Sequence, residues 1–357
     1  IGDAVIADIA IPCGKCLLCK NGDEANCVNM KMTNSKSINE APYLYGGYTQ
    51  VNYTPLSNLI KIPEEIDPVT AATFACPGPT AIHAFSLAEK AGVKLSEINS
   101  AVVQGLGPVG VFAIMYMKKQ GIKHIFAITT RKNTEREKAA LLLGAERVFN
   151  LTTEGTEAIT KELQEKNNGL GIDLCFEASG SPQAVKQGLD ILRNRGVYLV
   201  PGQYSNSNGI EIQPQLITFK ALHIIGSSQY SVNDVKKYLE FLKNNQDLYP
   251  LISNLSIKYP IEEINEAIEE AKRCIDCNCL ECMKGCAFLR YYNSYPKRMA
   301  REAYNNLAIA LGNRTSNKMI DSCNLCGQCA SICPGGLDLG EVLEYARNKM
   351  VKTDKMP

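Results

Sequence analysis

The chain of 357 residues has almost no net charge, because its 38 Lys and Arg residues nearly balance its 37 Asp and Glu residues. Neither sign forms a long run, so there is no electrostatic argument for nucleic acid or an anionic membrane as a partner. A long apolar segment is also missing. The most apolar stretch, residues 101–117, is interrupted by Gln104 and three glycines. We therefore predict no transmembrane helix.

The first residues lack both an initiator methionine and the basic-plus-apolar pattern of a signal peptide. The chain begins with Ile1-Gly2-Asp3 and ends with Lys355-Met356-Pro357, where no helix stop signal is present. We expect a fragment of a longer protein, although processing can also remove a start.

A glycine-rich turn between a strand and a helix is the first positive signal. The apolar run 101–103 leads through Gln104 into Gly105-Leu106-Gly107-Pro108-Val109-Gly110, and an apolar helix pattern follows as far as Gly121. In a G-x-G-x-x-G turn, the glycines permit a tight turn, close approach of a pyrophosphate, and close packing of helix on strand. We predict that Gly105, Gly107, Pro108, Val109 and Gly110 bind a dinucleotide. The alternative is a tight turn without a ligand.

The end of the next predicted strand, 125–128, bears on the choice of nucleotide. An acidic residue there would bind the ribose 2′-hydroxyl of NAD, whereas the chain has Thr129-Thr130-Arg131-Lys132. Hydroxyl groups and a guanidinium can bind a 2′-phosphate, which a carboxylate would repel. We therefore prefer NADP(H) over NAD(H). The alternative is a solvated basic loop.

The fifteen cysteines are grouped: four lie in 13–27, five in 274–286 and four in 323–333, so only Cys76 and Cys175 stand alone. Gaps of two or three residues favour ligation of metals or clusters over disulfides. A reducing cytoplasm is the compartment that we expect.

The first group lies in a segment, residues 1–75, in which short strand-like runs alternate with turn residues. Cys13, Cys16, Cys19 and Cys27 have the spacing of a closed tetrahedral zinc site. Such a site stabilises a loop and has no open position for catalysis. The alternative is a set of unligated or oxidised thiols.

The last group follows the bacterial ferredoxin pattern C-x₂-C-x₂-C-x₃-C-P, in which three thiolates hold one [4Fe–4S] cluster and the fourth reaches a second cluster. Its residues are Cys323, Cys326, Cys329 and Cys333. The middle group supplies Cys274, Cys277, Cys279, Cys282 and Cys286, one more than needed. The cysteine that is not needed is one of Cys274, Cys277 and Cys279. A pair of zinc sites is the alternative to two clusters.

Up to about Lys272, the chain resembles the medium-chain zinc-type alcohol and threonine dehydrogenases. The likeness rests on the first cysteine quartet, on Gly46-Gly47-Tyr48-Thr49, on the glycine motif and on Glu177-Ala178-Ser179-Gly180. The resemblance implies an α/β protein. A partial GroES-like β domain (1–75) would precede a Rossmann domain with a doubly wound parallel sheet (76–228), and a segment returning to the catalytic domain (229–272) would follow.

In the family, the catalytic zinc usually takes a cysteine and a Gly-His-Glu histidine from the region before Gly2, and a cysteine that matches Cys76. None of the three histidines here, His83, His124 and His223, precedes Cys76. We interpret Cys76 as a catalytic zinc ligand without its partners, and the alternative is a small buried residue. His83 is expected to be a packed helix residue and Cys175 a strand-core residue.

Residues 273–357 resemble a different kind of module. They are similar to the helical two-cluster ferredoxin domains of succinate dehydrogenase iron–sulfur subunits and heterodisulfide reductase C-type subunits. The opening 271–277 is also similar to the dicluster domain of glutamate synthase small subunits. Ala287 departs from this pattern, because it stands where a proline is expected.

Together these signals predict a cytoplasmic oxidoreductase in which a dehydrogenase for a small alcohol-type substrate is joined to an electron-transfer module. Hydride carries two electrons whereas a cluster accepts one, so we expect a flavoprotein or another redox partner between them. A homo-oligomer is left open. The alternative function is an electron-transfer subunit whose dehydrogenase fold is a catalytically silent scaffold.

Overall fold

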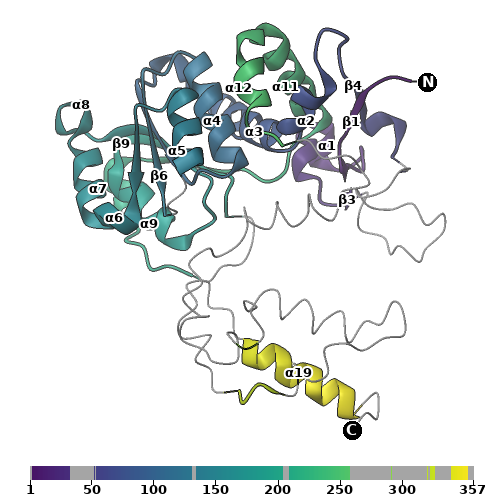
Figure 1. Cartoon of the computed structure of the whole chain (residues 1–357). Coiled ribbons are helices and arrows are strands. Elements are labelled where there is room, and N and C mark those ends of the chain that lie inside the picture. The colour runs from purple at the N-terminus through teal and green to yellow at the C-terminus, as the bar shows by residue number, and fades with distance from the viewer. Residues whose placement is uncertain are drawn as a thin grey trace. The chain divides into compact units, whose positions relative to one another are not determined.

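The computed structural model of the protein describes residues 2–32, 52, 54–130, 134–203, 209–257, 291, 320, 322–325 and 339–352. The chain divides into two compact units, Ile1–Ile257 and Lys258–Pro357, which are treated separately here (Figure 1).

A six-stranded sheet forms the centre of the first unit, with the strand order β10-β9-β8-β5-β6-β7. All five strand pairs are parallel. In chain order the strands are β5 (Ser100–Gln104), β6 (His124–Thr129), β7 (Arg147–Asn150), β8 (Ile172–Glu177), β9 (Leu192–Val200) and β10 (His223–Gly226). The chain reverses its winding direction at β5, which lies between β6 and β8. The predicted Rossmann-type parallel sheet is confirmed.

Helices cover both faces of this sheet, which explains why every residue of β5 and of β8 is buried. Val103 faces the core under α3 (Pro77–Lys90), α4 (Pro108–Lys119) and α11 (Val232–Asn244). Its neighbour Val102 faces the opposite core, to which α7 (Thr156–Gln164) and α9 (Pro182–Ile191) contribute. Figure 1 shows these two groups of helices on opposite sides of the sheet.

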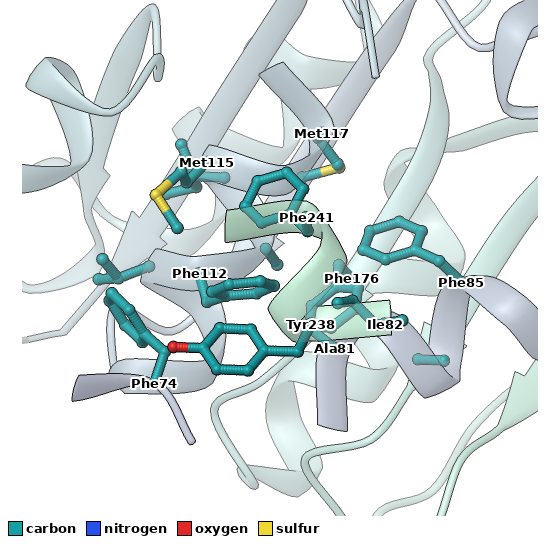
Figure 2. Close-up of a cluster of buried hydrophobic side chains, with 14 of the residues drawn as sticks. Phe74, Ala81, Ile82, Phe85, Phe112, Met115, Met117, Phe176, Tyr238 and Phe241 are labelled. Carbon is teal, nitrogen blue, oxygen red and sulfur yellow. The ribbon is translucent and has the colours of Figure 1, made fainter. Parts of the chain in front are cut away.

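Aromatic rings fill the larger core (Figure 2). Phe112 of α4 lies with its ring centroid 5.5 Å from that of Phe241 and 5.7 Å from that of Tyr238, both in edge contacts. Phe74 packs against the same ring at 5.4 Å. The hydroxyl of Tyr238 donates to the carbonyl of Ala71 at 2.8 Å, so its polar atom is satisfied inside the apolar core. These contacts join α11 to α4 and to the region of Ala71 and Phe74.

Two small antiparallel pairs precede the large sheet. β1 (Val5–Ala7) pairs with β4 (Leu59–Lys61), and β2 (Ala10–Ile11) pairs with β3 (Lys31–Met32). The remaining described elements are α1 (Leu17–Lys20), η1 (Glu24–Asn26), η2 (Leu56–Asn58), α2 (Pro68–Thr73), η3 (Leu95–Glu97), α5 (Thr134–Leu142), α6 (Leu151–Glu154), α8 (Lys166–Gly169), α10 (Gln215–Lys220), η4 (Gln246–Leu248) and α12 (Tyr249–Ser253).

In the second unit, the described element is α19 (Leu339–Lys352), the yellow helix of Figure 1. Leu339, Leu343 and Ala346 are buried on one side of it. Within the described ranges of the whole chain, no helix combines the length and the apolar character that crossing a membrane requires.

Candidate nucleotide and metal sites

The predicted glycine turn joins β5 to α4 and each of its glycines has a separate geometry. Gly105 has a φ of +97°, and a Cβ there would lie 2.8 Å from the Cα of Ser179. A Cβ on Gly110 would overlap the backbone oxygen of Gly105 and lie 3.1 Å from Val103 Cγ1. A Cβ on Gly107 would meet no atom within 4 Å. Gly105 and Gly110 therefore serve internal packing, whereas Gly107 borders open space that a ligand can use.

The position of this turn suits an anion. Gly107 is the N-cap of α4, and Pro108 is its first residue, which has no backbone N–H group. The next backbone N–H groups, those of Val109 and Gly110, have no partner within the helix. The turn lies at the carboxyl end of β5, where the sheet changes its winding direction, and ligands of open α/β sheets bind at such points. The residues present therefore fit the pyrophosphate of a dinucleotide.

Glu177 organises the neighbouring loop and was not singled out as a site residue from the sequence. This fully buried residue at the end of β8 accepts hydrogen bonds at Oε1 from Ser179 N (2.7 Å), Ser179 Oγ (2.5 Å) and Gly180 N (2.9 Å). Its carbonyl accepts from Gly202 N at 2.9 Å. The carboxylate thus fixes the loop after β8 beside the glycine turn, and the backbone carbonyl of Glu177 joins this loop to the segment after β9. In the sequence, Glu177 stood in a motif that supported the family resemblance, but nothing there indicated these hydrogen bonds.

The two threonines predicted to select the nucleotide lie at the end of β6. Thr129 is its last residue and is buried, whereas Thr130 is exposed, and the carbonyl of Thr130 accepts from Thr152 Oγ1 at 2.7 Å. β6 and β5 are neighbours, so Thr129 and the glycine turn share one edge of the sheet. Arg131 and Lys132 lie outside the described residues.

The first cysteine quartet is assembled as a metal site. The four sulfur atoms lie within 4.8 Å of one another. A zinc ion with Zn–S bonds of about 2.3 Å separates its sulfurs by about 3.8 Å in a tetrahedron. The sulfur of Cys16 lies 3.4 Å from that of Cys19 and 4.0 Å from that of Cys27, so the sulfurs fit this geometry. Among the described residues, no other group of three or more metal-ligating side chains is found.

Short local structure places these thiols. Cys16 caps α1, which places Cys19 one turn later, and the chain returns through η1 to Cys27. Backbone N–H groups of Cys13 and Asn29 donate to the sulfur of Cys27 at 3.2 and 3.4 Å. Hydrogen bonds of this kind stabilise thiolates, and the second shell of metal sites commonly supplies them.

Without metal, Cys13 and Cys19 differ in acidity. N–H groups of Lys15 and Cys16 lower the pKa of Cys13 to about 6. Burial and the neighbouring thiols raise the pKa of Cys19 to about 12. A metal ion binds thiolates, so its binding must displace a proton from Cys19 at neutral pH.

Cys76 lies apart from the quartet as the N-cap of α3, and it is exposed, so the alternative of a small buried residue does not describe it. Its side chain is a hydrogen-bonding neighbour of Tyr230, whose pKa is raised by burial and by Cys76. Asp8 lies near Tyr230 and is 1% exposed, with an Oδ2 that has no hydrogen-bond partner. Burial raises the pKa of Asp8 to about 6.

Two further residues have the expected packing. His83 is buried in α3, and its Nδ1 lies 3.0 Å from Oδ2 of Asp234 in α11, a partner that the sequence did not indicate. Cys175 is fully buried in β8, where burial raises the pKa of its thiol well above the ordinary value. Such a thiol is unreactive at neutral pH.

In the second unit, Cys323 is the one candidate cluster ligand among the described residues, and it is partly exposed. The other cysteines of 274–286 and 323–333 lie outside the described residues. Four sulfur donors in the C-x₂-C-x₂-C-x₃-C-P arrangement suit a [4Fe–4S] cluster by their chemistry.

Two family models match the chain. Residues 108–244 match the zinc-binding dehydrogenase model, and residues 273–338 match the 4Fe-4S dicluster domain. The second match covers both later cysteine groups.

Known proteins extend the first match. An L-threonine 3-dehydrogenase of Caldanaerobacter subterraneus is 28% identical over 272 residues, which cover 75% of this chain and 72% of that protein. A sorbitol dehydrogenase of Bacillus subtilis is 26% identical over 272 residues, with 76% and 71% covered. The crystal structure of an alcohol dehydrogenase from Thermotoga maritima superposes with a TM-score of 0.68 at 26% identity, covering 76% of this chain and 74% of that one.

These matches agree with the six-stranded parallel sheet. The chain thus resembles the zinc-type alcohol and threonine dehydrogenases, and its C-terminal part carries a 4Fe-4S dicluster domain.

Proposed function

We propose that the chain is an NADP(H)-dependent dehydrogenase for a small alcohol, polyol or 3-hydroxy amino acid, joined to an electron-transfer module with two [4Fe–4S] clusters. The observation that best supports the dehydrogenase function is the geometry of the glycine turn. Packing requires glycine at positions 105 and 110 but leaves open space at position 107. The domain limits 1–75, 76–228, 229–272 and 273–357 belong to this proposal.

In this proposal, the pyrophosphate binds to the glycine turn, and the N-terminus of α4 complements its negative charge. The residues of the turn are Gly105, Gly107, Pro108, Val109 and Gly110. The 2′-phosphate binds at the end of β6, to Thr129, Thr130, Arg131 and Lys132. Glu177 keeps the Ser179–Gly180 loop beside the turn through three hydrogen bonds. A bound nicotinamide supplies a hydride acceptor.

The metal assignments follow from the donor sets. Cys13, Cys16, Cys19 and Cys27 hold a structural zinc ion, and their four sulfurs leave no open position. Cys76 is proposed as one ligand of a catalytic zinc ion. Its exposure at the start of α3 supports this role, since a metal ligand must be reachable by the other ligands and by substrate.

The cluster module is proposed to use Cys323, Cys326, Cys329 and Cys333 together with four of Cys274, Cys277, Cys279, Cys282 and Cys286. A flavoprotein partner converts between two-electron and one-electron transfer, because neither module has a flavin-binding motif in this sequence. We further propose a cytoplasmic location, since reduced thiols dominate the proposed sites.

Titration of the anaerobically purified chain with NADPH and NADH tests the nucleotide half. We expect NADPH to bind more tightly than NADH, and no binding of either would contradict the proposal. Metal analysis tests the other half: about eight irons are expected if two clusters are present, and about one zinc for the quartet. Stopped-flow mixing with NADPH should leave the clusters oxidised until a flavoprotein is added.

A second candidate function is a silent dehydrogenase scaffold in an electron-transfer subunit. The observation that favours it is the absence, within the described residues, of metal-ligating side chains grouped with Cys76. A chain that holds about eight irons but binds no nucleotide would support this reading.

A further inference from the structure

Helix α19 packs through one apolar face against its own unit. Leu339, Leu343 and Ala346, at helical spacing, are at most 1% exposed, whereas Tyr345 is 66% exposed. The fully buried Ile320 belongs to the same unit and precedes the last cysteine group. The match to the 4Fe-4S dicluster domain ends at residue 338, one residue before α19 begins.

Arg347 connects this helix to the cysteine motif. Its Nε donates a hydrogen bond to the carbonyl of Ile320 at 2.9 Å, and its Nη2 donates to the carbonyl of Cys323. Cys323 is the first residue of the C-x₂-C-x₂-C-x₃-C-P run. One planar guanidinium therefore joins two carbonyls that lie three residues apart, at the point where the chain enters the proposed cluster loop.

The backbone after this contact contains one residue in an unusual conformation. Leu325 has a φ of +56°, a left-handed conformation that is rare for a leucine. It lies between Cys323 and Cys326, which are two of the proposed ligands. A residue that is strained in this way persists where its surroundings hold it. Arg347 holds the chain on the N-terminal side of Leu325.

We propose that Arg347 is a positioning residue for the cluster that Cys323 ligates, and that α19 is a functional part of the cluster module. The guanidinium fixes the backbone of Cys323 and brings a positive charge next to a cluster ligand. A reduced cluster carries one more negative charge than the oxidised cluster, so a nearby cation favours reduction. This inference rests on the proposed [4Fe–4S] clusters.

The test uses the full chain, purified anaerobically, with the variants R347Q and R347K. E344Q is the matched control, since Glu344 is an exposed residue one turn earlier on α19. Iron content, the electron paramagnetic resonance spectrum of the reduced clusters, and redox potentiometry are measured for each protein.

We expect R347Q to lower the potential of one of the two clusters. A roughly tenfold change in the reduction equilibrium corresponds to about 59 mV for one electron. R347K retains the positive charge but not the bidentate hydrogen bonding of the guanidinium. The potential of the same cluster should therefore fall by less than in R347Q. Loss of about four irons in R347Q, with E344Q unchanged, would also support the role.

Three results would overturn the inference. In the first, R347Q keeps the wild-type iron content, spectrum and potentials, which removes the role of Arg347 but leaves the clusters in place. In the second, E344Q changes the same cluster as much as R347Q does. In the third, wild-type protein contains no iron, and then the proposed cluster function fails together with the inference.

Discussion

His83 Nδ1 lies 3.0 Å from Asp234 Oδ2, and both side chains are at most 6% exposed. This pair joins α3 to α11 across 151 positions of sequence. The same Asp234 oxygen accepts hydrogen bonds from the backbone N–H and the hydroxyl of Ser231, each at 2.9 Å, and so caps α11. One buried carboxylate therefore caps α11 and joins it to α3.

Asp234→Ala should destabilise the first unit by roughly 3–5 kcal/mol, because it leaves a buried histidine without its partner and removes a helix cap. Asp234→Asn should cost less, since the amide can still accept hydrogen bonds. Denaturant unfolding monitored by circular dichroism measures both variants. Asn233→Ala, at the exposed neighbouring position, is the control and should change stability by less than about 0.5 kcal/mol.

The same carboxylate predicts a response to acid. Burial opposes ionisation of Asp234, but the hydrogen bond and the charge of His83, together with Ser231, hold its pKa below the ordinary value of 3.8. A lowered pKa adds stability above the ordinary value, and this contribution disappears as the pH falls below it. In acid unfolding from pH 6 to pH 2, the stability difference between wild type and Asp234→Asn should therefore shrink below about pH 4. A constant difference would contradict the assignment.

The glycine turn predicts opposite outcomes for two similar substitutions. Gly107→Ala adds a methyl group in open space, so the fold should remain while NADPH binding weakens by roughly tenfold, or about 1.4 kcal/mol. Gly110→Ala drives a methyl group into the Gly105 backbone and should cost roughly 1–3 kcal/mol of stability or more. Thermal melting and fluorescence titration separate the two effects. Equal loss of stability in both variants would be inconsistent with the open position at Gly107.

Asp8 should destabilise the folded chain at neutral pH. Burial raises its pKa from 3.8 to about 6, so the folded state prefers the protonated form, and stability is lost as the pH rises from about 4 through 6. Asp8→Asn should therefore be more stable than wild type at pH 8, by roughly 1–3 kcal/mol, and should lose this advantage near pH 4.5. Asp3→Asn, at an exposed residue paired with Lys61, should show no such crossover. Urea unfolding of wild type and the two variants at both pH values measures these stability differences.

Removal of the structural metal should unfold the loop that contains the quartet. Cys19 is 8% exposed, and its sulfur is one of four that lie together. Cys19→Ser removes this sulfur, so we expect the zinc content to fall by about one ion per chain. We expect the melting temperature to drop as well, because binding of a structural metal stabilises the folded state. Cys76→Ser is the control, because the exposed Cys76 stands outside the quartet and the quartet's zinc should remain. If Cys19→Ser retained its zinc and its melting temperature, the proposed site would be wrong.

Local patterns were readable from the sequence because their geometry is set within a few residues. The glycine turn needs positive φ at Gly105 and close packing at Gly110, and both requirements show as glycines at fixed spacing. Cys13, Cys16 and Cys19 follow one another at three-residue steps, and a short helix that begins after Cys16 contains Cys19. The parallel sheet was implied by the resemblance, and its central strands β5 and β8, which are buried throughout, read as largely apolar runs.

Other features depended on contacts between distant segments. His83 could be assigned to a core from its sequence context, but its partner Asp234 lies in a helix whose sequence shows only an ordinary amphipathic pattern. Glu177 stood in a recognised motif, yet its three hydrogen bonds require the loop to fold back over the carboxylate. Cys76 was assigned a role by resemblance, and only the fold places it beside Tyr230.

The sequence by itself therefore determined which residue types are spaced for ligand binding: thiols at metal spacing, and glycines at the spacing of a phosphate-binding turn. Only the tertiary structure decided which buried polar groups are paired and which carbonyls a guanidinium contacts, as with Asp234 and His83, or Arg347 and Cys323. The reason is physical. Backbone conformation and ligand spacing are local properties of the chain, whereas a charge or a carbonyl finds its partner only when packing brings distant segments together.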